Sequence, residues 1–313
     1  MKIEDLHYSI PTSQIDENGF DKEKWHQECP MDYLKAIYIL NMADNPIVKT
    51  EVFKIIYQVT RLHIPAVLYK YYSLSDDVDL NEKKFQTLSD CKIFMSAIKD
   101  FNDPYDSKCF FYDPSQLSDI ERLKQHNGRM IDDFASYIRG TALTENGTQS
   151  MPMWAHYSNN HAGFCVAYDM DAAVNLQLRA STFPVQYIDE RLDISSFMKK
   201  QAEVISAKID HDIAMGIKEI TIDDLSMIFV PQLLYNLKLS QWSYEKEFRC
   251  STASNAKGMP YIDATPKAIY IGINCCEENR KKLLSIARHL SIPIYQMKLD
   301  EYSRDYSLGS KLL

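Results

Sequence analysis

The sequence contains little glycine and proline, with 9 Gly and 12 Pro among 313 residues. This scarcity excludes collagen-like repeats and argues against long flexible linkers and low-complexity segments. Hydrophobic residues make up 45% of the chain and charged residues 25%, as in an average globular protein. The chain can therefore form an ordinary apolar core, either as one large domain or as one domain with a smaller attachment.

A surplus of basic residues is also missing. Lys and Arg number 35 against 43 Asp and Glu, which gives a net charge of -8, and no run of five like charges occurs. Non-specific nucleic-acid binding depends on cationic side chains that displace counterions from phosphates. Nucleic acid is therefore not favoured as a partner.

Targeting and membrane signals are absent as well. The opening residues MKIEDLHYSI contain no apolar core of a signal peptide, and no apolar run approaches about 18 residues. We expect a cytoplasmic protein that makes no contact with membranes. Its odd number of cysteines favours free, mostly buried thiols in a reducing compartment: Cys29, Cys91, Cys109, Cys165, Cys250, Cys275 and Cys276.

Three familiar active-site motifs do not occur. The chain has no Gly-x-Gly-x-x-Gly, no P-loop and no Gly-x-Ser-x-Gly. Dinucleotide binding of the Rossmann type, P-loop phosphate binding and the usual serine hydrolase elbow therefore have no support.

The apolar pattern predicts a helical start followed by an α+β domain. Residues 31–43 and 50–62 have helical spacing and are separated by Asn45-Pro46, so 1–64 is predicted to be an N-terminal helical appendage for packing or association. Residues 65–313 then form the α+β domain, with a mixed, mainly antiparallel sheet core and inserted helices. Its strands are predicted at 67–72, 92–96, 161–169, 183–188, 241–250, 268–273 and 294–299, and its helices at 115–139, 153–158, 195–220, 223–240 and 277–290.

The segment 241–250 carries the strongest chemical signal. Side chains of a strand alternate between its faces, so Glu245, Glu247 and Arg249 would share one face, and Trp242 could wall a pocket beside them. Two carboxylates and a guanidinium can stabilise positive charge, or exchange a proton if one pKa is shifted. The alternative is a solvent-exposed face with ordinary surface ion pairs.

Two further segments carry polar candidates. His156 and His161 flank a turn near Gly163, which would let backbone or ligand approach closely. Cys165 and Asp169 would share the strand face of His161, but the spacing matches no established zinc pattern, so we predict no metal site. In Phe101-Asn102-Asp103-Pro104-Tyr105-Asp106, Asn and Asp before Pro fix a turn, or Asn102 and Asp106 form a polar wall of the same cleft.

These motifs together resemble the bacterial domain of unknown function 2971, over roughly residues 65–300. The resemblance rests on Leu68-Tyr69-Lys70-Tyr71, on Phe101 to Asp106, on Met153-Trp154-Ala155-His156-Tyr157 through Gly163-Phe164, and on Trp242 to Arg249. The family carries no activity with it.

The order of these elements is also similar to the layout of ADP-ribosyltransferase-like folds. That likeness implies NAD as a substrate and no other cofactor. Glu247 or Glu245 would form a hydrogen bond with a hydroxyl of the nicotinamide ribose and stabilise an oxocarbenium-like transition state. Tyr69 or Tyr71 would stack on nicotinamide, and Ser96 would help to seat the ribose.

Three functions stay open. The first is NAD-dependent ADP-ribosyl transfer or NAD cleavage; the second is a non-catalytic ligand- or protein-binding sensor, in either case with a role in defence or stress response. The third is a metal-dependent nuclease.

We expect a small-molecule ligand, with protein binding or self-association through the N-terminal helices. The candidate catalytic residues are Glu247, Glu245 and His156, and the candidate binding residues are Tyr69, Tyr71, Ser96, Asn102, Asp103, Asp106, Trp154, Tyr157, His161, Trp242 and Arg249.

Overall fold

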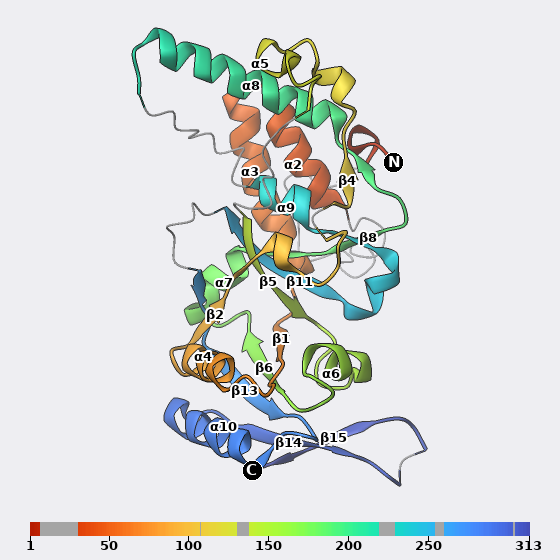
Figure 1. Ribbon diagram of the computed structural model, residues 1–313, viewed down its shortest axis with the longest axis vertical. Helices are drawn as coiled ribbons and strands as arrows, with labels where there is room; N and C mark the ends of the chain where they lie inside the picture. The colour runs from red at the N-terminus through yellow and green to blue at the C-terminus, as the bar shows by residue number, and fades with distance from the viewer. Residues whose placement is uncertain (7–30, 107, 130–137, 219–228, 254–259, 303) are drawn as a thin grey trace, which may run out of the picture.

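A mixed sheet runs through the middle of the computed structural model, which describes residues 1–6, 31–106, 108–129, 138–218, 229–253, 260–302 and 304–313 (Figure 1). Within these residues the strand order is β15-β14-β13-β6-β1-β5-β11-β7, with β3 also paired to β5. All neighbours in this sheet are antiparallel except β13 and β14, which confirms the predicted fold class. The bounds are β1 Val67–Tyr72, β3 Ser96–Ala97, β5 Ile138–Thr144, β6 Phe164–Asp169, β7 Thr182–Pro184, β11 Glu247–Ala253, β13 Pro266–Ile271, β14 Ile294–Leu299 and β15 Leu308–Leu312.

Three short strand pairs lie outside this sheet. They join β2 (Lys92–Phe94) to β12 (Tyr261–Asp263), β4 (Phe110–Phe111) to β9 (Leu192–Asp193), and β8 (Gln186–Ile188) to β10 (Leu237–Leu239). The pairs of β4 with β9 and of β8 with β10 are parallel, and Lys238 of β10 contacts Glu247 at the start of β11.

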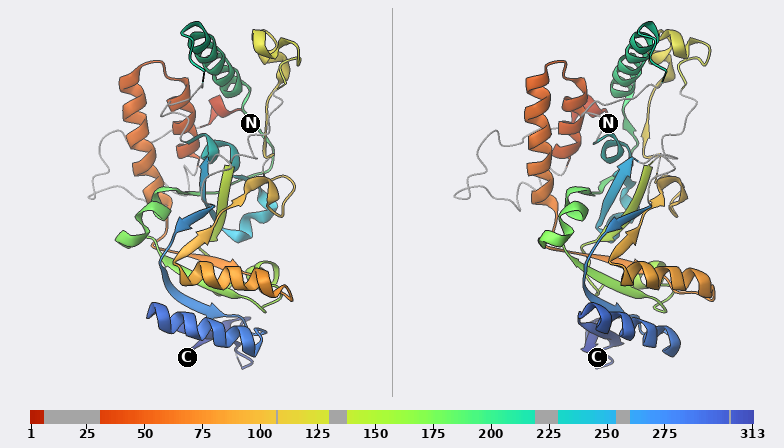
Figure 2. Two further views of the ribbon diagram at one scale, coloured as in Figure 1. Left: turned by 60° about the vertical axis from the view of Figure 1, so that its left-hand side comes forward. Right: turned by 90° about the vertical axis from the view of Figure 1, so that its left-hand side faces the viewer.

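Helices cover both faces of the sheet and gather at one end of the molecule. On one face α4 (Val78–Ser89) and α10 (Glu277–Leu290) pack over an apolar cluster that includes Phe85, Phe164 and Leu283. On the other face α6 (Met151–Tyr157) packs over Tyr71 and Cys165. The views in Figures 1 and 2 place α10, β14 and β15 at the end opposite α2, α3 and α8.

The predicted N-terminal helices exist as α2 (Asp32–Met42) and α3 (Pro46–His63), and the Asn45 side chain caps α3 as the predicted break requires. They share one apolar core with α8 (Ser195–Ala214) and α9 (Val230–Tyr235), to which Leu34, Phe197 and Leu233 contribute. The helices and the later part of the chain thus bury a common core. The division at residue 64 and an association role for these helices stay predictions.

Several predicted elements are wrong in the described residues. The long helix expected at 115–139 is replaced by a 3-10 helix at Pro114–Leu117 and a single helical turn at Glu121–Lys124, after which β5 begins at Ile138. The chain turns at Gly128, which has φ +76, and Gly140 lies within β5 instead of ending a helix. Residues 130–137 lie outside the described residues.

The helix expected at 223–240 is confirmed only at Val230–Tyr235 (α9), and its last part is wrong because β10 follows; residues 219–228 are outside the described ranges. The strand predicted at 183–188 is divided between β7 and β8, since Pro184 offers no backbone N–H to continue the ladder. The strand at 161–169 begins only at Phe164, after a left-handed His161, so the shared face of His161, Cys165 and Asp169 does not exist.

The unit β13-α10-β14 agrees closely with the prediction: α10 spans Glu277–Leu290 and β14 spans Ile294–Leu299. Two further short α-helices of the described ranges are α5 (Glu121–Lys124) and α7 (Leu176–Ala180). No helix within the described ranges is long and apolar enough to cross a membrane. The six cysteines in these ranges are free, three of them buried, while Cys29 lies outside.

Candidate functional site

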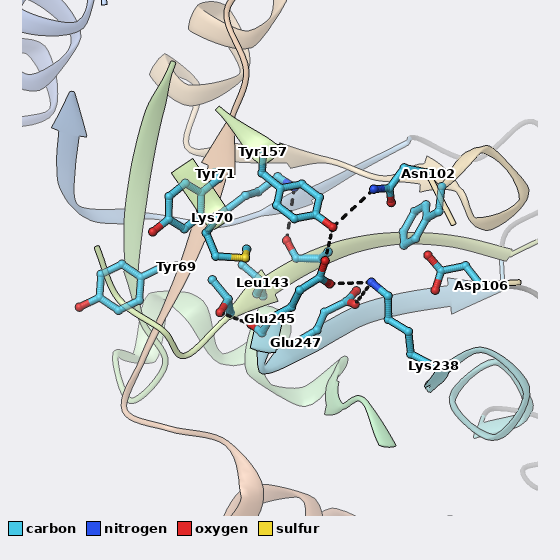
Figure 3. A pocket seen from close by; sticks show the side chains of 14 residues that line it. Tyr69, Lys70, Tyr71, Asn102, Asp106, Leu143, Tyr157, Lys238, Glu245 and Glu247 are labelled. Carbon is cyan, nitrogen blue, oxygen red and sulfur yellow. Dashed lines mark hydrogen bonds and ion pairs between the residues drawn. The ribbon is translucent and has the colours of Figure 1, made fainter. Parts of the chain in front are cut away.

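A pocket lies where β1, β5, α6 and the loop at Phe101 meet the start of β11 (Figure 3). Strand register explains its position, because Thr144 of β5 pairs with both Tyr69 of β1 and Glu247 of β11. Directly paired residues point to one face of an antiparallel sheet, so these three side chains form a row. Seven of the predicted site residues line the pocket: Tyr69, Tyr71, Asn102, Asp106, Tyr157, Glu245 and Glu247.

Lys238 organises the carboxylates at the bottom of the pocket. Its ammonium group donates to Glu245 Oε2 at 2.6 Å and to Glu247 Oε2 at 2.9 Å. All three side chains are nearly inaccessible to solvent, with 3%, 3% and 4% exposed. One ammonium nitrogen thus separates the two carboxylates, as Figure 3 shows.

Arg249 lies beneath the pocket and joins Glu247 to Asp106. Its Nε donates to Glu247 Oε1 at 2.7 Å, one Nη donates to Asp106 Oδ1, and the other donates to the Tyr235 carbonyl at 2.6 Å. The guanidinium also lies 5.3 Å from the ring centroid of Phe101. We call Asp106, Lys238, Glu245, Glu247 and Arg249 the floor network.

The two glutamates of the floor network have opposite pKa shifts. Burial opposes ionisation of Glu247, but the charges of Arg249 and Lys238 outweigh it and lower the pKa of Glu247 to about 2. Burial raises the pKa of Glu245, and the charge of Glu247 adds to this rise against the effect of Lys238. Burial also raises the pKa of Asp106. The floor therefore contains one firmly ionised carboxylate beside two that hold a proton more readily.

Glu245 does not belong to the strand that the alternation predicted, and this prediction is wrong. Residues Ser240–Glu245 form a 3-10 helix, Lys246 adopts φ 45, and β11 starts at Glu247. Thr144 fixes the turn, because its hydroxyl donates to the Glu245 carbonyl at 2.5 Å. The left-handed residue turns Glu245 back over the pocket, so both glutamates still meet at Lys238.

Aromatic and amide side chains form the rim. The Tyr157 hydroxyl donates to Glu245 Oε1, and Asn102 Nδ2 lies 3.5 Å from the same hydroxyl. Tyr71 is held by a hydrogen bond to the Gly147 carbonyl at 2.7 Å and by an edge contact with Trp154 at 5.0 Å between ring centroids. The rim thus offers fixed rings for stacking and polar groups for orientation.

Some predicted site residues support the pocket from outside its lining. Trp154 is fully buried behind Tyr71, and its indole N–H donates to the Thr148 carbonyl at 2.9 Å. His161 stacks on Trp154 at 6.0 Å between centroids. Asp103 caps the turn by accepting from the Tyr105 N–H at 2.9 Å, as the Asn-Asp-Pro motif predicts.

Three others do not reach the pocket. His156 is exposed and absent from the lining, so the structure gives no support to its predicted catalytic role. Ser96 lies in β3, which pairs with Gly140 on the same edge of β5 as β1 but four residues away from Thr144, and it does not line the pocket. The Trp242 ring lies 5.1 Å from the Lys238 ammonium and also stays outside the lining.

Sequence reasoning missed Lys238. It lies between Leu237 and Leu239 in a stretch that was predicted to be helical, so its charge looked like an ordinary exposed lysine. A lysine enclosed by apolar residues, seven positions before Glu245, was the available signal, because buried lysines are almost always paired.

Within the described residues, no group of three or more His, Cys, Asp or Glu side chains is placed to hold a metal ion.

Comparison with known families gives one result that agrees with the resemblance in the motifs. The family described as protein of unknown function (DUF2971) matches residues 153–250, a segment that contains α6, Lys238, Glu245, Glu247 and Arg249. The predicted resemblance is thereby confirmed over that segment. No curated protein and no solved structure matches the chain.

Proposed function

We propose that the protein is an enzyme that acts on the bond between nicotinamide and ribose in NAD, by cleavage or by ADP-ribosyl transfer. The observation that supports this most is the glutamate pair on one ammonium group, with pKa values shifted in opposite directions, at the bottom of a tyrosine-lined pocket. Carboxyl pairs whose environments separate their pKa values are typical of acid and base roles. Enzymes that cleave glycosidic bonds commonly use two such carboxyl groups.

The chemistry assigns each glutamate a role. The bond between ribose C1′ and the nicotinamide nitrogen breaks, and its electron pair leaves with nicotinamide. Glu247 remains ionised and stabilises the positive charge that develops on the ribose. Glu245, with its raised pKa, accepts the proton of the water or acceptor hydroxyl whose oxygen bonds to C1′.

The rim fits a substrate with a flat ring. Tyr69 and Tyr71 of β1 and Tyr157 of α6 line the pocket, and the contacts of Tyr71 hold its ring in place. Rings fixed in this way can stack on nicotinamide with little loss of side-chain entropy. Tyr157 also holds the Glu245 carboxylate in position through its hydroxyl.

A non-catalytic binding module is the second candidate, and one observation favours it. Both carboxylate oxygens of Glu247 already accept hydrogen bonds from Lys238 and Arg249, as expected of a structural brace. In that case the same pocket would hold a ligand without converting it. We do not propose the nuclease, because Lys238 and Arg249 occupy the carboxylates that a magnesium ion would need.

Turnover of NAD by the full chain separates these functions. NAD labelled on nicotinamide and on adenine is incubated with the protein, alone and with cell extract as a source of acceptors. The enzyme releases free nicotinamide, and Glu245→Gln lowers the rate by about 100-fold or more, the usual effect of losing a general base. Glu145→Gln is the matched control, because Glu145 is exposed and outside the lining, and its rate stays at the wild-type value.

Unchanged NAD under all these conditions would contradict the proposed enzymatic activity. Binding of NAD without turnover would favour the binding module. Equal rates in wild type and Glu245→Gln would show that the glutamate pair is not the reaction centre.

A further inference from the structure

One carboxylate oxygen of the floor network has no protein partner. Asp106 is 1% exposed and lines the pocket, and its Oδ1 accepts a hydrogen bond from Arg249. Its Oδ2 is buried and finds no hydrogen-bond donor in the described part of the chain. Buried carboxylate oxygens are costly to leave unpaired, so this oxygen is placed to accept a hydrogen bond from a ligand.

The charges of the floor network point to the same kind of ligand. Among the described residues it combines three carboxylates, from Asp106, Glu245 and Glu247, with the two cations Lys238 and Arg249. With all five groups ionised, the floor carries one net negative charge, and Glu247 stays negative when Glu245 and Asp106 hold protons. Asp106 in its ionised form attracts a cation or a hydrogen-bond donor and repels an anion.

Lys70 is also among the residues that line the pocket, and the Glu247 charge acts on its ammonium group, but that group makes no hydrogen bond or ion pair with a carboxylate of the floor network. Side chains alternate along β1, and the Lys70 ammonium lies 5.3 Å from the ring centroid of Tyr72, whose own ring stacks on Phe164 in the apolar cluster under α4 and α10. It is also 3.4 Å from the Ala142 carbonyl. Its charge is therefore directed to the opposite face of the sheet.

The surroundings of Asp106 suit a flat group that carries a donor. Phe101 and Asn102 belong to the same loop and also line the pocket. The Phe101 ring is backed by the Arg249 guanidinium at 5.3 Å, so it stands as a fixed wall next to the carboxylate. A planar cationic ring with a primary amide would meet an aromatic wall and an acceptor together.

We infer that Asp106 determines specificity: its Oδ2 accepts a hydrogen bond from the carboxamide of a cationic nicotinamide ring. This inference rests on the proposed function and names the part of the substrate that the pocket distinguishes. A carboxylate in place of the carboxamide has no hydrogen to donate and is repelled by Asp106 and Glu247. The pocket therefore selects the amide form of the ring over the acid form.

Asp103 provides a matched control. It is also a buried aspartate of this loop with an unpartnered Oδ2, but it caps the turn through the Tyr105 N–H and does not line the pocket. Asp103→Asn makes the same change in charge and volume as Asp106→Asn, three positions earlier in the loop. Only the residue at the pocket should change ligand selectivity.

The test uses N-methylnicotinamide and N-methylnicotinate, two cationic rings without a glycosidic bond that could be cleaved. Their dissociation constants are measured by calorimetry or ligand-observed NMR on the full chain. Wild type binds the amide about tenfold more tightly than the acid, as expected when one acceptor loses its donor. Asp106→Asn and Asp106→Ser bring this ratio within about twofold of unity, and Asp103→Asn keeps it.

A wild-type ratio near one, no binding of either ring, or an unchanged ratio in a folded Asp106 variant would overturn the inference. Because neither probe can react, binding and turnover are judged separately. Selective binding without NAD turnover contradicts the proposed reaction alone, and turnover without selectivity at Asp106 contradicts this inference alone. If Asp106→Asn fails to fold, the wild-type ratio and the serine variant still decide.

Discussion

Lys238 is the residue on which the pocket depends most. Its ammonium group reaches both Glu245 and Glu247, and the side chain is only 3% exposed. A buried ion pair contributes little net stability, but removal of one partner leaves the other charge in a medium that cannot solvate it. The loss of Lys238 would leave two such carboxylates close together.

The stability of the Lys238→Met variant tests whether the buried carboxylates depend on Lys238. We expect the free energy of unfolding to fall by about 3 kcal/mol or more, measured by urea denaturation followed by circular dichroism. Lys246→Met is the control, because Lys246 is exposed and pairs with Glu145 at 3.6 Å, so its effect should stay within about 0.5 kcal/mol. Equal small losses in both variants would mean that the floor network is not held by Lys238.

For single residues, the sequence motifs predicted the acidic and aromatic side chains of the pocket. Glu245, Glu247, Asp106 and Tyr157 belong to recognisable motifs and do line the pocket. Lys238 could not be assigned, because its role depends on a strand pairing, β8 with β10, that no local pattern encodes. His156 was assigned to the site because it flanks, with His161, the turn near Gly163, but helix geometry directs it to a different side of α6 from its neighbour Tyr157, which lines the pocket.

Among the elements, the turn that leads into β6 is the most constrained. A Cβ atom on Gly163 would lie 1.9 Å from the Tyr72 carbonyl oxygen and 3.0 Å from that of Ser158. Its N–H donates to the Ser158 carbonyl at 2.7 Å, and its carbonyl accepts from the Gly272 N–H at 2.9 Å. The turn therefore joins α6 to the central strands with no space for a side chain.

Gly163→Ala is expected to destabilise the protein by about 2 kcal/mol or more, because backbone must move to admit the methyl group. Gly309→Ala serves as the control, since its Cβ would meet the flexible Lys298 side chain at 3.1 Å. Thermal unfolding followed by circular dichroism measures both. A Gly163 variant as stable as the Gly309 variant would show that this close approach does not constrain the fold.

Elements with a strong local pattern were predictable, and elements made by tertiary contacts were not. The strand β1 and the unit from β13 to β14 follow directly from their apolar periodicity. The segment 240–246 has the alternation of a strand but forms a 3-10 helix, because Thr144 and Asn146 bind its carbonyl groups. Periodicity carries no information about such partners.

On the scale of the whole molecule, strand order creates the site. The strands β1, β5 and β11 are neighbours in the sheet although the chain separates them by more than sixty residues each time. The pocket thus joins the loop at Phe101, the helix α6 and the residues around Lys238 (Figure 3). The sequence indicated which segments carry polar residues, whereas their convergence follows only from the sheet order and the strand register.

Hydrogen exchange with and without saturating NAD tests this convergence most directly. We predict slower amide exchange in residues 101–106, 151–157 and 237–247 together, because one ligand contacts all three segments. Residues 308–312 of β15, at the far edge of the sheet, should exchange at the same rate in both conditions. Unchanged exchange in the three segments, or protection confined to a different part of the molecule, would contradict the claim that they form one ligand pocket.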